Sequence, residues 1–399
     1  RRLAISFNNL ADLYRVQGKH AEAEPLFQQA LAIWEKTLGP DHPELAMGIN
    51  NLAVLYHQQG RYAEAESLHQ RALAIREKAL QPEDPDVAAS AHNLAGVYRQ
   101  QGKYREAESD YTRLLAEQEK ALGREHLRLG WVLDKLAELS RIENRYGEAE
   151  RLLERALTIR KKALGPEHLD VAVSLTDLGS LHLAQGNSAK AEHLLKSALA
   201  IRERQLGRDH LDVAASLDSL AAVYAAGADA GLENVPRSSG SPTLQLYRMN
   251  ILAEYGRAEP LWKRALAIRE KALGLDHPDL VVTLNNLGTL YYRRGKYAEA
   301  EPLCQRALTI RETNMAADHP GLVTELTNLA NLYRQQGKYR EAEPLYQRQV
   351  AILEKALGRE HPAVAAALES YAGVLRKLKR EAEAADLEAQ AKAIREKKQ

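Results

Sequence analysis

Histidine is the residue whose spacing most suggests chemistry in this sequence. Seven histidines and one aspartate recur at the same place in a repeated linker: His42, Asp84, His126, His168, His210, His277, His319 and His361. A zinc ion needs several ligands within about 2.0–2.3 Å, whereas packed helices lie about 8–10 Å apart. Because each stacked segment supplies only one histidine, these side chains cannot converge on one ion. We therefore predict no metal site and expect each side chain to hydrogen-bond within its own linker.

The single cysteine and the motifs that are missing argue against an enzyme. Cys304 lies on the apolar face of a helical pattern, and no histidine stands at a telling position beside it. A buried cysteine behaves as a small hydrophobic residue. The sequence contains no glycine-rich phosphate loop, no His-Glu-x-x-His pair and no Gly-x-Ser-x-Gly elbow. We predict no catalytic residue, no cofactor and no enzymatic activity.

Composition narrows the class of partner. The 399 residues include 55 lysines and arginines against 54 aspartates and glutamates, which gives a net charge of +1. Binding nucleic acid or an anionic membrane through charge needs a net basic surface. No apolar run approaches the roughly 18 residues of a membrane span, no signal peptide is visible, and one cysteine suits a reducing compartment. We predict a cytoplasmic protein that binds neither nucleic acid nor membranes. The start at Arg1, inside a repeat, leads us to expect a fragment of a longer protein.

One short stretch, Ala-Glu-Pro-Leu-x-x-Arg-Ala-Leu-x-Ile-Arg-Glu, organises the whole chain. Its first alanine recurs at Ala23, Ala65, Ala107, Ala149, Ala191, Ala258, Ala300, Ala342 and Ala384. Every step is 42 residues except the one from Ala191 to Ala258, which is 67, so one repeat carries 25 extra residues. A strict period of this length indicates stacked repeats. We predict a single solenoid over residues 1–399, with repeats at 1–41, 42–83, 84–125, 126–167, 168–209, 210–276, 277–318, 319–360 and 361–399.

Each repeat has the pattern of two helices joined by a tight turn. In the second repeat, Leu45, Ile49 and Leu52 recur at three- and four-residue steps, which places them on one face of a helix. Gly60 follows, where glycine can adopt the left-handed conformation that closes a helix. A second helix then runs to about Leu80. The equivalent turn residues are Gly18, Gly102, Asn144, Gly186, Gly295 and Gly337.

Two repeats depart from the pattern. In the third, Asp110 and Glu117 replace leucine and isoleucine at positions that are normally buried. Such carboxylates are costly unless they are paired or solvated, and we expect that helix to fray or rotate. In the sixth, the short turn becomes the insertion 227–254. Its first part, 227–240, is rich in Gly, Ala, Pro and Ser and predicts a disordered loop. Residues 243–252 predict an extra turn or two of helix.

The repeat columns carry a family resemblance. A pattern of Leu-Ala/Gly-x-x-Tyr and then Ala-x-x-x-aromatic-x-x-Ala is present, or nearly so, at Leu52, Ala53, Tyr56, Ala65, His69 and Ala72, and at Leu287, Gly288, Tyr291, Ala300, Cys304 and Ala307. This pattern resembles the tetratricopeptide repeat. The 42-residue period with Asp-His-Pro and Gly-Lys-Tyr resembles the kinesin light-chain type. The resemblance implies an all-α fold, a right-handed α-solenoid of nine helix pairs. The near-identity of the copies favours a bacterial origin.

The resemblance also implies a function. It predicts a protein-interaction scaffold that binds an extended, acidic segment of a partner protein in a concave groove lined by the first helix of each repeat. The alternative is the sensor or regulatory array of a larger signalling ATPase or caspase-like protease, whose catalytic domain lies outside this sequence.

Twelve side chains on the first helices are the predicted peptide-binding residues. Five share one column, which we name the amide column: Asn9, Asn51, Asn93, Asn286 and Asn328. An amide offers both a donor and an acceptor to a peptide backbone, and in related arrays the matching asparagine contacts the peptide. The alternative is a bond to a neighbouring helix.

A second column lies six residues further along the first helices and contains Arg15, Arg99, Arg141, Tyr292, Arg334 and Arg376. Arginine suits carboxylate recognition. Trp131 completes the set as an aromatic anchor, with packing beneath residues 110–117 of the preceding repeat as the alternative.

Overall fold

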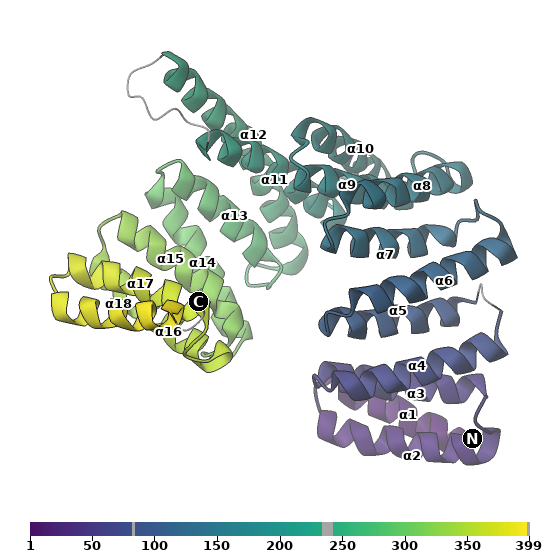
Figure 1. Ribbon diagram of the computed structural model, residues 1–399. Helices are drawn as coiled ribbons and strands as arrows, with labels where there is room; N and C mark the ends of the chain where they lie inside the picture. Colours follow the sequence, from purple (N-terminus) through teal and green to yellow (C-terminus); the bar gives the residue numbers. More distant parts are fainter. Residues whose placement is uncertain (82–83, 234–241, 397–399) are drawn as a thin grey trace. The chain divides into compact units, whose positions relative to one another are not determined.

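The computed structural model describes residues 1–81, 84–233 and 242–396, and these form helices in consecutive antiparallel pairs without a strand (Figure 1). The first nine helices are α1 (Arg2–Val16), α2 (His20–Leu38), α3 (Pro43–Gln58), α4 (Tyr62–Ala79), α5 (Pro85–Gln100), α6 (Tyr104–Leu122), α7 (Leu129–Ile142), α8 (Tyr146–Leu164) and α9 (Leu169–Ala184). The others are α10 (Ser188–Leu206), α11 (Leu211–Glu233), α12 (Pro242–Leu273), α13 (Leu280–Arg293), α14 (Tyr297–Asn314), the short η1 (Pro320–Leu322), α15 (Val323–Gln335), α16 (Tyr339–Leu357), α17 (Pro362–Lys377) and α18 (Glu381–Glu396). The predicted all-α fold of nine helix pairs is confirmed.

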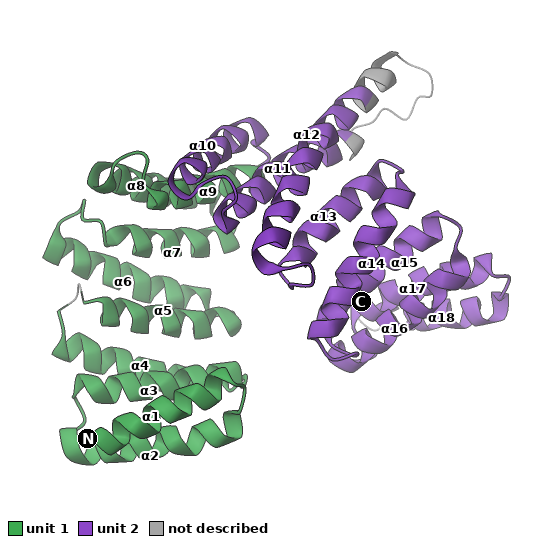
Figure 2. Cartoon of the chain, turned by 180° about the vertical axis from the view of Figure 1, so that it is seen from behind, with its two compact units in different colours: residues 1–185 green, residues 186–399 purple. Residues whose placement is uncertain are grey.

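The chain divides into two compact units, residues 1–185 and residues 186–399 (Figure 2). The N-terminal unit contains α1 to α9, and the C-terminal unit contains α10 to α18. Within each unit, helices that follow one another in the sequence pack together. The prediction of one continuous right-handed solenoid stays a prediction.

The turns and linkers have the geometry that the sequence predicted. Gly60 has φ +75°, and Asn144, which takes the place of glycine in the fourth repeat, has φ +60°. Lys379 adopts the same conformation in the last repeat, at φ +63°, without a glycine to signal it. In all seven linker histidines, Nδ1 accepts a hydrogen bond of 3.0–3.3 Å from the backbone N–H two residues later. The predicted local role of these histidines is confirmed.

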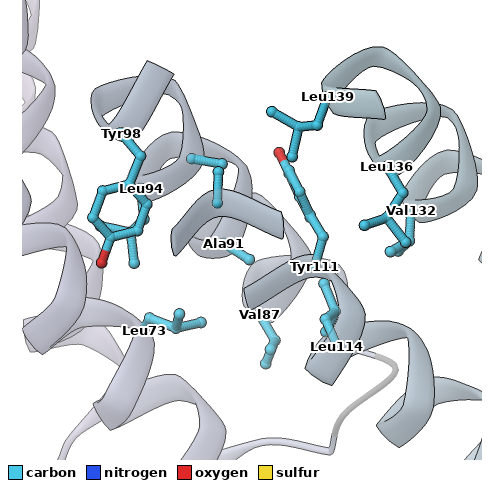
Figure 3. Close-up of a cluster of buried hydrophobic side chains, with 12 residues drawn as sticks. Leu73, Val87, Ala91, Leu94, Tyr98, Tyr111, Leu114, Val132, Leu136 and Leu139 are labelled. Atoms are coloured by element: carbon cyan, nitrogen blue, oxygen red, sulfur yellow. The ribbon is translucent and has the colours of Figure 1, made fainter. Parts of the chain in front are cut away.

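The core is a series of small clusters rather than one central mass. One cluster joins Leu73 of α4, Leu94 of α5, Tyr111 of α6 and Leu136 of α7, and Figure 3 shows their side chains packed together. Apolar side chains from one helix pair thus complete the core of the next pair. This arrangement makes each repeat depend on its neighbours for burial.

The predicted fraying of the third repeat is wrong. Helix α6 is continuous over Tyr104–Leu122. The guanidinium of Arg113 lies 3.7 Å from the carboxylate of Asp110 and 3.4 Å from that of Glu117. It also forms an ion pair with Glu77 at 2.6 Å. Burial nevertheless raises the pKa of Asp110. An arginine on the same helix therefore offsets the charge that the sequence places there.

The insertion in the sixth repeat is largely a helical extension. Helix α11 continues to Glu233, so the prediction of a loop is wrong for 227–233, while the remainder of that prediction, 234–240, lies outside the described residues. Helix α12 starts at Pro242, which confirms the predicted helix over 243–252. The two helices are tied together where the hydroxyl of Tyr255 donates to Asp229 at 2.5 Å.

One helical segment among the described residues, Leu211–Gly231 in α11, is long and apolar enough by composition to cross a membrane. Asp212 and Asp218 interrupt the apolar residues of this segment, so the sequence shows no continuous apolar run there. Half of this segment is buried inside the protein, and Leu217 packs against Ala265 and Ile268 of α12. A helix buried in the core of a folded protein can have the same length and apolar composition as a membrane-spanning helix.

Candidate functional site

The amide column separates into bonded and unbonded members. The first helices carry all five asparagines, of which Asn9 is exposed and the others are half-buried. The Nδ2 group of Asn51 donates to Oδ1 of Asn8 at 3.1 Å, and that of Asn93 donates to Oδ1 of Asn50 at 2.9 Å. Asn51 and Asn93 thus join their helix to the first helix of the preceding repeat, which was the alternative to peptide binding.

Asn286 and Asn328 differ from these two. Within the described residues, neither side chain has a hydrogen-bond partner. By its place in the repeat, the acceptor for Asn328 should be Asn285. However, Asn285 donates through Nδ2 to Glu325 at 3.1 Å, and its buried Oδ1 has no partner among the described residues. The seventh and eighth repeats therefore present free amides on their first helices.

Most of the predicted arginines already face carboxylates. Three of them form ion pairs: Arg15 with Asp12 at 2.8 Å, Arg99 with Glu138 at 2.9 Å, and Arg376 with Glu388 at 2.6 Å.

Arg141 and Arg334 are exposed and have no ion pair among the described residues. Arg334 donates to Oδ1 of Asn331 at 3.4 Å. Arg141 lines a pocket of about 410 Å³ that also contains Lys135, Asp134, Glu138 and Asp177. Acidic side chains therefore lie among the predicted basic cluster of the N-terminal unit.

Trp131 packs partly against its neighbours. Its half-buried ring meets that of Tyr111 edge-on, with centroids 5.8 Å apart, and that of His92 at 5.6 Å. Tyr111 lies within the cluster of Figure 3, where burial raises its pKa. This contact matches the packing alternative considered for Trp131, and its role as an anchor stays a prediction.

A second pocket lies between two first helices of the C-terminal unit. It has a volume of about 310 Å³, and its walls include two predicted site residues, Tyr292 of α13 and Asn328 of α15. Cys304 of α14 also lines it and is 4% exposed. Burial raises the pKa of this thiol to about 11, so the sulfur stays protonated near neutral pH. A protonated, buried thiol is a poor nucleophile.

An arginine repeated on the second helices, buried at Arg76 and Arg160 and half-buried in the other repeats that have it, was not predicted from the sequence. In five repeats an arginine of the second helix contacts the residue 14 positions later on the next first helix: Arg76–Ser90, Arg160–Ser174, Arg202–Ser216, Arg269–Thr283 and Arg311–Glu325. Arg160 also forms a bidentate pair with Asp134 of α7, at 3.0 and 2.5 Å. This contact could have been predicted from the sequence. The arginine is part of the repeat motif, and a small polar residue recurs 14 positions after it.

A second set of repeated polar residues links consecutive repeats. The hydroxyl of Tyr56 donates to Glu24 of the preceding repeat at 2.9 Å, and Arg61 pairs with the same carboxylate at 3.0 Å. Tyr224 donates in the same way to Glu192 at 3.0 Å. Neighbouring repeats are therefore joined by a polar contact. The glutamate of one repeat motif bonds to the tyrosine and the basic side chain near the turn of the next repeat. Side chains without such internal partners are the ones left to bind a ligand.

Comparison with known proteins identifies the repeat. The description "Tetratricopeptide repeat" matches residues 2–78, 86–162, 135–204, 250–313 and 322–397. The chain belongs to the tetratricopeptide repeat family. No curated protein matches this tetratricopeptide repeat (TPR) chain.

Several solved structures are similar to this TPR chain. The nearly identical TPR-like repeats assigned to a kinesin light chain of Podosopora anserina are 33% identical, cover 50% of this chain and 94% of their own, and give a TM-score of 0.44. BtubC (BKLC) from P. vanneervenii is 22% identical over 68% of this chain and 92% of its own, with a TM-score of 0.47. A monomeric IFIT1 mutant with m7Gppp-AAAA is 16% identical over 97% of this chain and 80% of its own, with a TM-score of 0.49. The kinesin light-chain type of repeat, predicted from the sequence, is confirmed.

Proposed function

We propose that this TPR protein is a scaffold that binds an extended, acidic segment of a partner protein along its first helices. The observation that carries the proposal is the free amide of Asn328 in the pocket between α13 and α15. A free amide can satisfy the N–H and the C=O of a peptide backbone together. Arg334, six residues after Asn328 on α15, and Arg141 supply exposed guanidinium groups for acidic side chains.

A peptide array probed with the intact chain tests this proposal. Asn286→Ala/Asn328→Ala should weaken binding by about 1–3 kcal/mol for each buried hydrogen bond lost. Arg141→Glu/Arg334→Glu should weaken it less in high salt than in low salt, because screening already reduces exposed charge pairs. Arg71→Ala, on the second helix α4 and paired with Glu35, is the matched control. Hits that are basic or wholly apolar, or parent-like binding by both double variants, would show the proposal to be wrong.

Asn51 and Asn93 belong in the same experiment as a separate double variant. Their amides already bond to the preceding first helix. A loss of binding in Asn51→Ala/Asn93→Ala without loss of helical signal would place the peptide across the N-terminal unit as well.

We also propose that the chain is cytoplasmic, is not an enzyme, and binds neither nucleic acid nor membranes, on the balance of charge and the single cysteine. Its alternative role, as the regulatory array of a signalling ATPase or caspase-like protease, depends on flanking sequence. A catalytic domain encoded next to this segment in its gene would favour that role.

A further inference from the structure

The first arginine of the repeat motif binds the same two groups in several repeats. These groups are the carboxylate of the glutamate that ends the preceding motif and a backbone carbonyl of the linker after it. Arg155 lies 2.6 Å from Glu119 and donates to the carbonyl oxygen of Arg124 at 2.8 Å. We call the carboxylate and the carbonyl together an arginine site. The same contacts recur for Arg264 with Glu203 and Arg208, for Arg306 with Glu270 and Leu275, and for Arg348 with Glu312 and Ala317.

The ninth repeat lacks the arginine although the glutamate before it is kept. Gln390 stands at the arginine position, and its amide donates to Asp386 of the same helix at 2.9 Å. Glu354 remains at the glutamate position. In the fifth repeat, by contrast, both members change, because Ser197 replaces the arginine and Lys161 replaces the glutamate. The site at Glu354 thus keeps its carboxylate without an arginine from the next second helix.

The neighbouring Arg359 does not take the place of that arginine. Its guanidinium lies 3.7 Å from the carboxylate of Glu354. Arg124 lies at the same distance from Glu119, and that carboxylate nevertheless binds Arg155 as well. A carboxylate has two oxygens and about four lone-pair positions, so it can accept from two arginines. Glu354 can therefore bind a second guanidinium.

The site forms a pocket of about 220 Å³ between α16, the linker after it, α17 and α18, whose order Figure 1 shows. Glu354, Glu360 and Arg359 line its polar side. Leu368 and Ile394, which are 2% and 9% exposed, line its apolar side. An arginine packs the methylene groups of its stem on apolar surface while its charged head reaches polar groups. The pocket therefore suits both parts of an arginine side chain.

We propose that this pocket binds an arginine side chain of a partner protein, in the way that the preceding repeats bind arginines of the chain itself. Arginine fits better than lysine, because its planar fork donates to a carboxylate and a carbonyl at once, whereas an ammonium group is a point charge. None of the nine repeats has a lysine at this position. The site goes beyond the proposed function, since it lies outside both first-helix columns and takes a basic segment rather than an acidic one.

Two small probes, N-acetyl-arginine amide and N-acetyl-lysine amide, test the site on the full chain. The methyl NMR signals of Leu368 and Ile394 report binding in the pocket. The arginine probe should shift both signals saturably, with a Kd in the millimolar range because exposed charge pairs are weak. The lysine probe should bind about threefold more weakly, because it lacks the fork.

Variants at Gln390 and Glu354 separate the guanidinium contact from the shape of the pocket. Gln390→Arg gives the ninth repeat the arginine that other repeats have, and should fill the site from within and abolish binding of the arginine probe. Gln390→Ala removes the same side chain without filling the site, and is the matched control with parent-like binding. Glu354→Gln keeps the shape but removes the charge, and should weaken binding of the arginine probe by about threefold.

Arg348→Gln reproduces the arrangement one repeat earlier. It leaves Glu312 and the carbonyl of Ala317 without their arginine, and should create a second binding site. The methyl signals of Leu326 and Ile352, which stand at the equivalent positions of the lining, should then respond to the arginine probe. They should not respond in the parent.

The outcomes distinguish this site from the proposed function. No binding of the arginine probe by the parent, equal binding of the two probes, or parent-like binding by Gln390→Arg would overturn the arginine site. Gln390→Arg should still capture acidic peptides as the parent does, and Asn286→Ala/Asn328→Ala should keep the response of Ile394 to the arginine probe. If no acidic peptide is captured while that response is present, the scaffold proposal is refuted and the arginine site is upheld.

Discussion

At the scale of single residues, the repeated arginines of the second helices are matched to the residues that they contact on the next first helix. Where the second helix lacks this arginine, the residue 14 positions later changes with it. Trp34 faces Gly48, where a Cβ atom would lie 2.5 Å from the indole ring, and Leu353 packs with Ala367 in one buried cluster. Volume and polarity at the two positions therefore vary together within one chain. A change at one position should be tolerated only with a change at the other.

Arg160→Leu tests this coupling. Its guanidinium bridges Asp134 and Ser174 across three helices, and burial raises the pKa of Asp134 even with the arginine present. Removing the arginine leaves the half-buried carboxylate of Asp134 unpaired, which should lower the free energy of unfolding of the N-terminal unit by about 3 kcal/mol, the lower end of the range for a fully buried pair. Chemical denaturation followed by circular dichroism measures the loss.

The eighth and ninth repeats offer the control for that variant. Thr327 and Leu353 of the eighth repeat and Ala367 of the ninth stand at the three equivalent positions. The triple variant Asp134→Thr/Arg160→Leu/Ser174→Ala transfers this set to the fourth and fifth repeats, and should recover most of the lost stability because the charged pair is removed whole. A triple variant as unstable as Arg160→Leu would contradict the coupling.

His69 should make the second repeat sensitive to acid. Its ring is 1% exposed and bonds through Nδ1 to Asn50 at 3.1 Å. Burial lowers its pKa from 6.5 to about 4. Between these values the unfolded chain binds a proton that the folded chain does not, so stability is fully present above pH 6.5 and falls as the pH approaches 4. The loss should be on the order of 3 kcal/mol.

Hydrogen exchange of α3 and α4 against pH measures that effect. His69→Leu places at this position the residue that the fourth and fifth repeats have at Leu153 and Leu195. It should remove the pH dependence between 6.5 and 4 in these two helices. Equal slopes in the parent and the variant would mean that His69 does not stay neutral in the folded chain.

At the scale of elements, the extension of α11 shows where composition misleads. Glycines in 227–231 suggested a loop, but the alanines between them favour helix, and α12 packs alongside. Gly231 faces Ile251, which is 6% exposed, and a Cβ atom at Gly231 would lie 2.8 Å from it. The glycine marks a close approach of two helices, which a single sequence does not distinguish from a flexible turn.

Gly231→Val should therefore open this helical extension. The added side chain collides with Ile251, and such overpacking costs about 1–3 kcal/mol. Hydrogen exchange should become faster over 227–231 and 249–255 and stay unchanged in α13 to α18. Ala230→Val, at the exposed neighbouring residue, is the control. Parent-like exchange in Gly231→Val would show that the two helices do not pack closely in solution.

At the scale of the whole molecule, the structural features that could be predicted from the sequence are those that recur in each repeat. Helix pairs, turns and histidine caps repeat every 42 residues and were predictable, because each involves residues close together in the chain. The state of each amide was not predictable. Asn93 and Asn328 occupy equivalent positions, yet Asn93 bonds to Asn50, whereas Asn328 is free and Asn285 donates to Glu325 instead. The difference accompanies Glu325, a residue of another column on the same helix as Asn328.

Unfolding should proceed in steps, since each repeat buries its core mainly against its neighbours. Destabilising one repeat should then expose that repeat and those beside it while distant repeats stay folded. Arg160→Leu supplies the perturbation: in hydrogen exchange, protection should fall in α7, α8 and α9 and stay at the parent value in α13 to α18. Gly231→Val should also act locally, with faster exchange over 227–231 and 249–255 and with α1 to α6 unchanged. If either variant lowers protection equally in every helix, the chain unfolds as one cooperative body and the nearest-neighbour description is wrong.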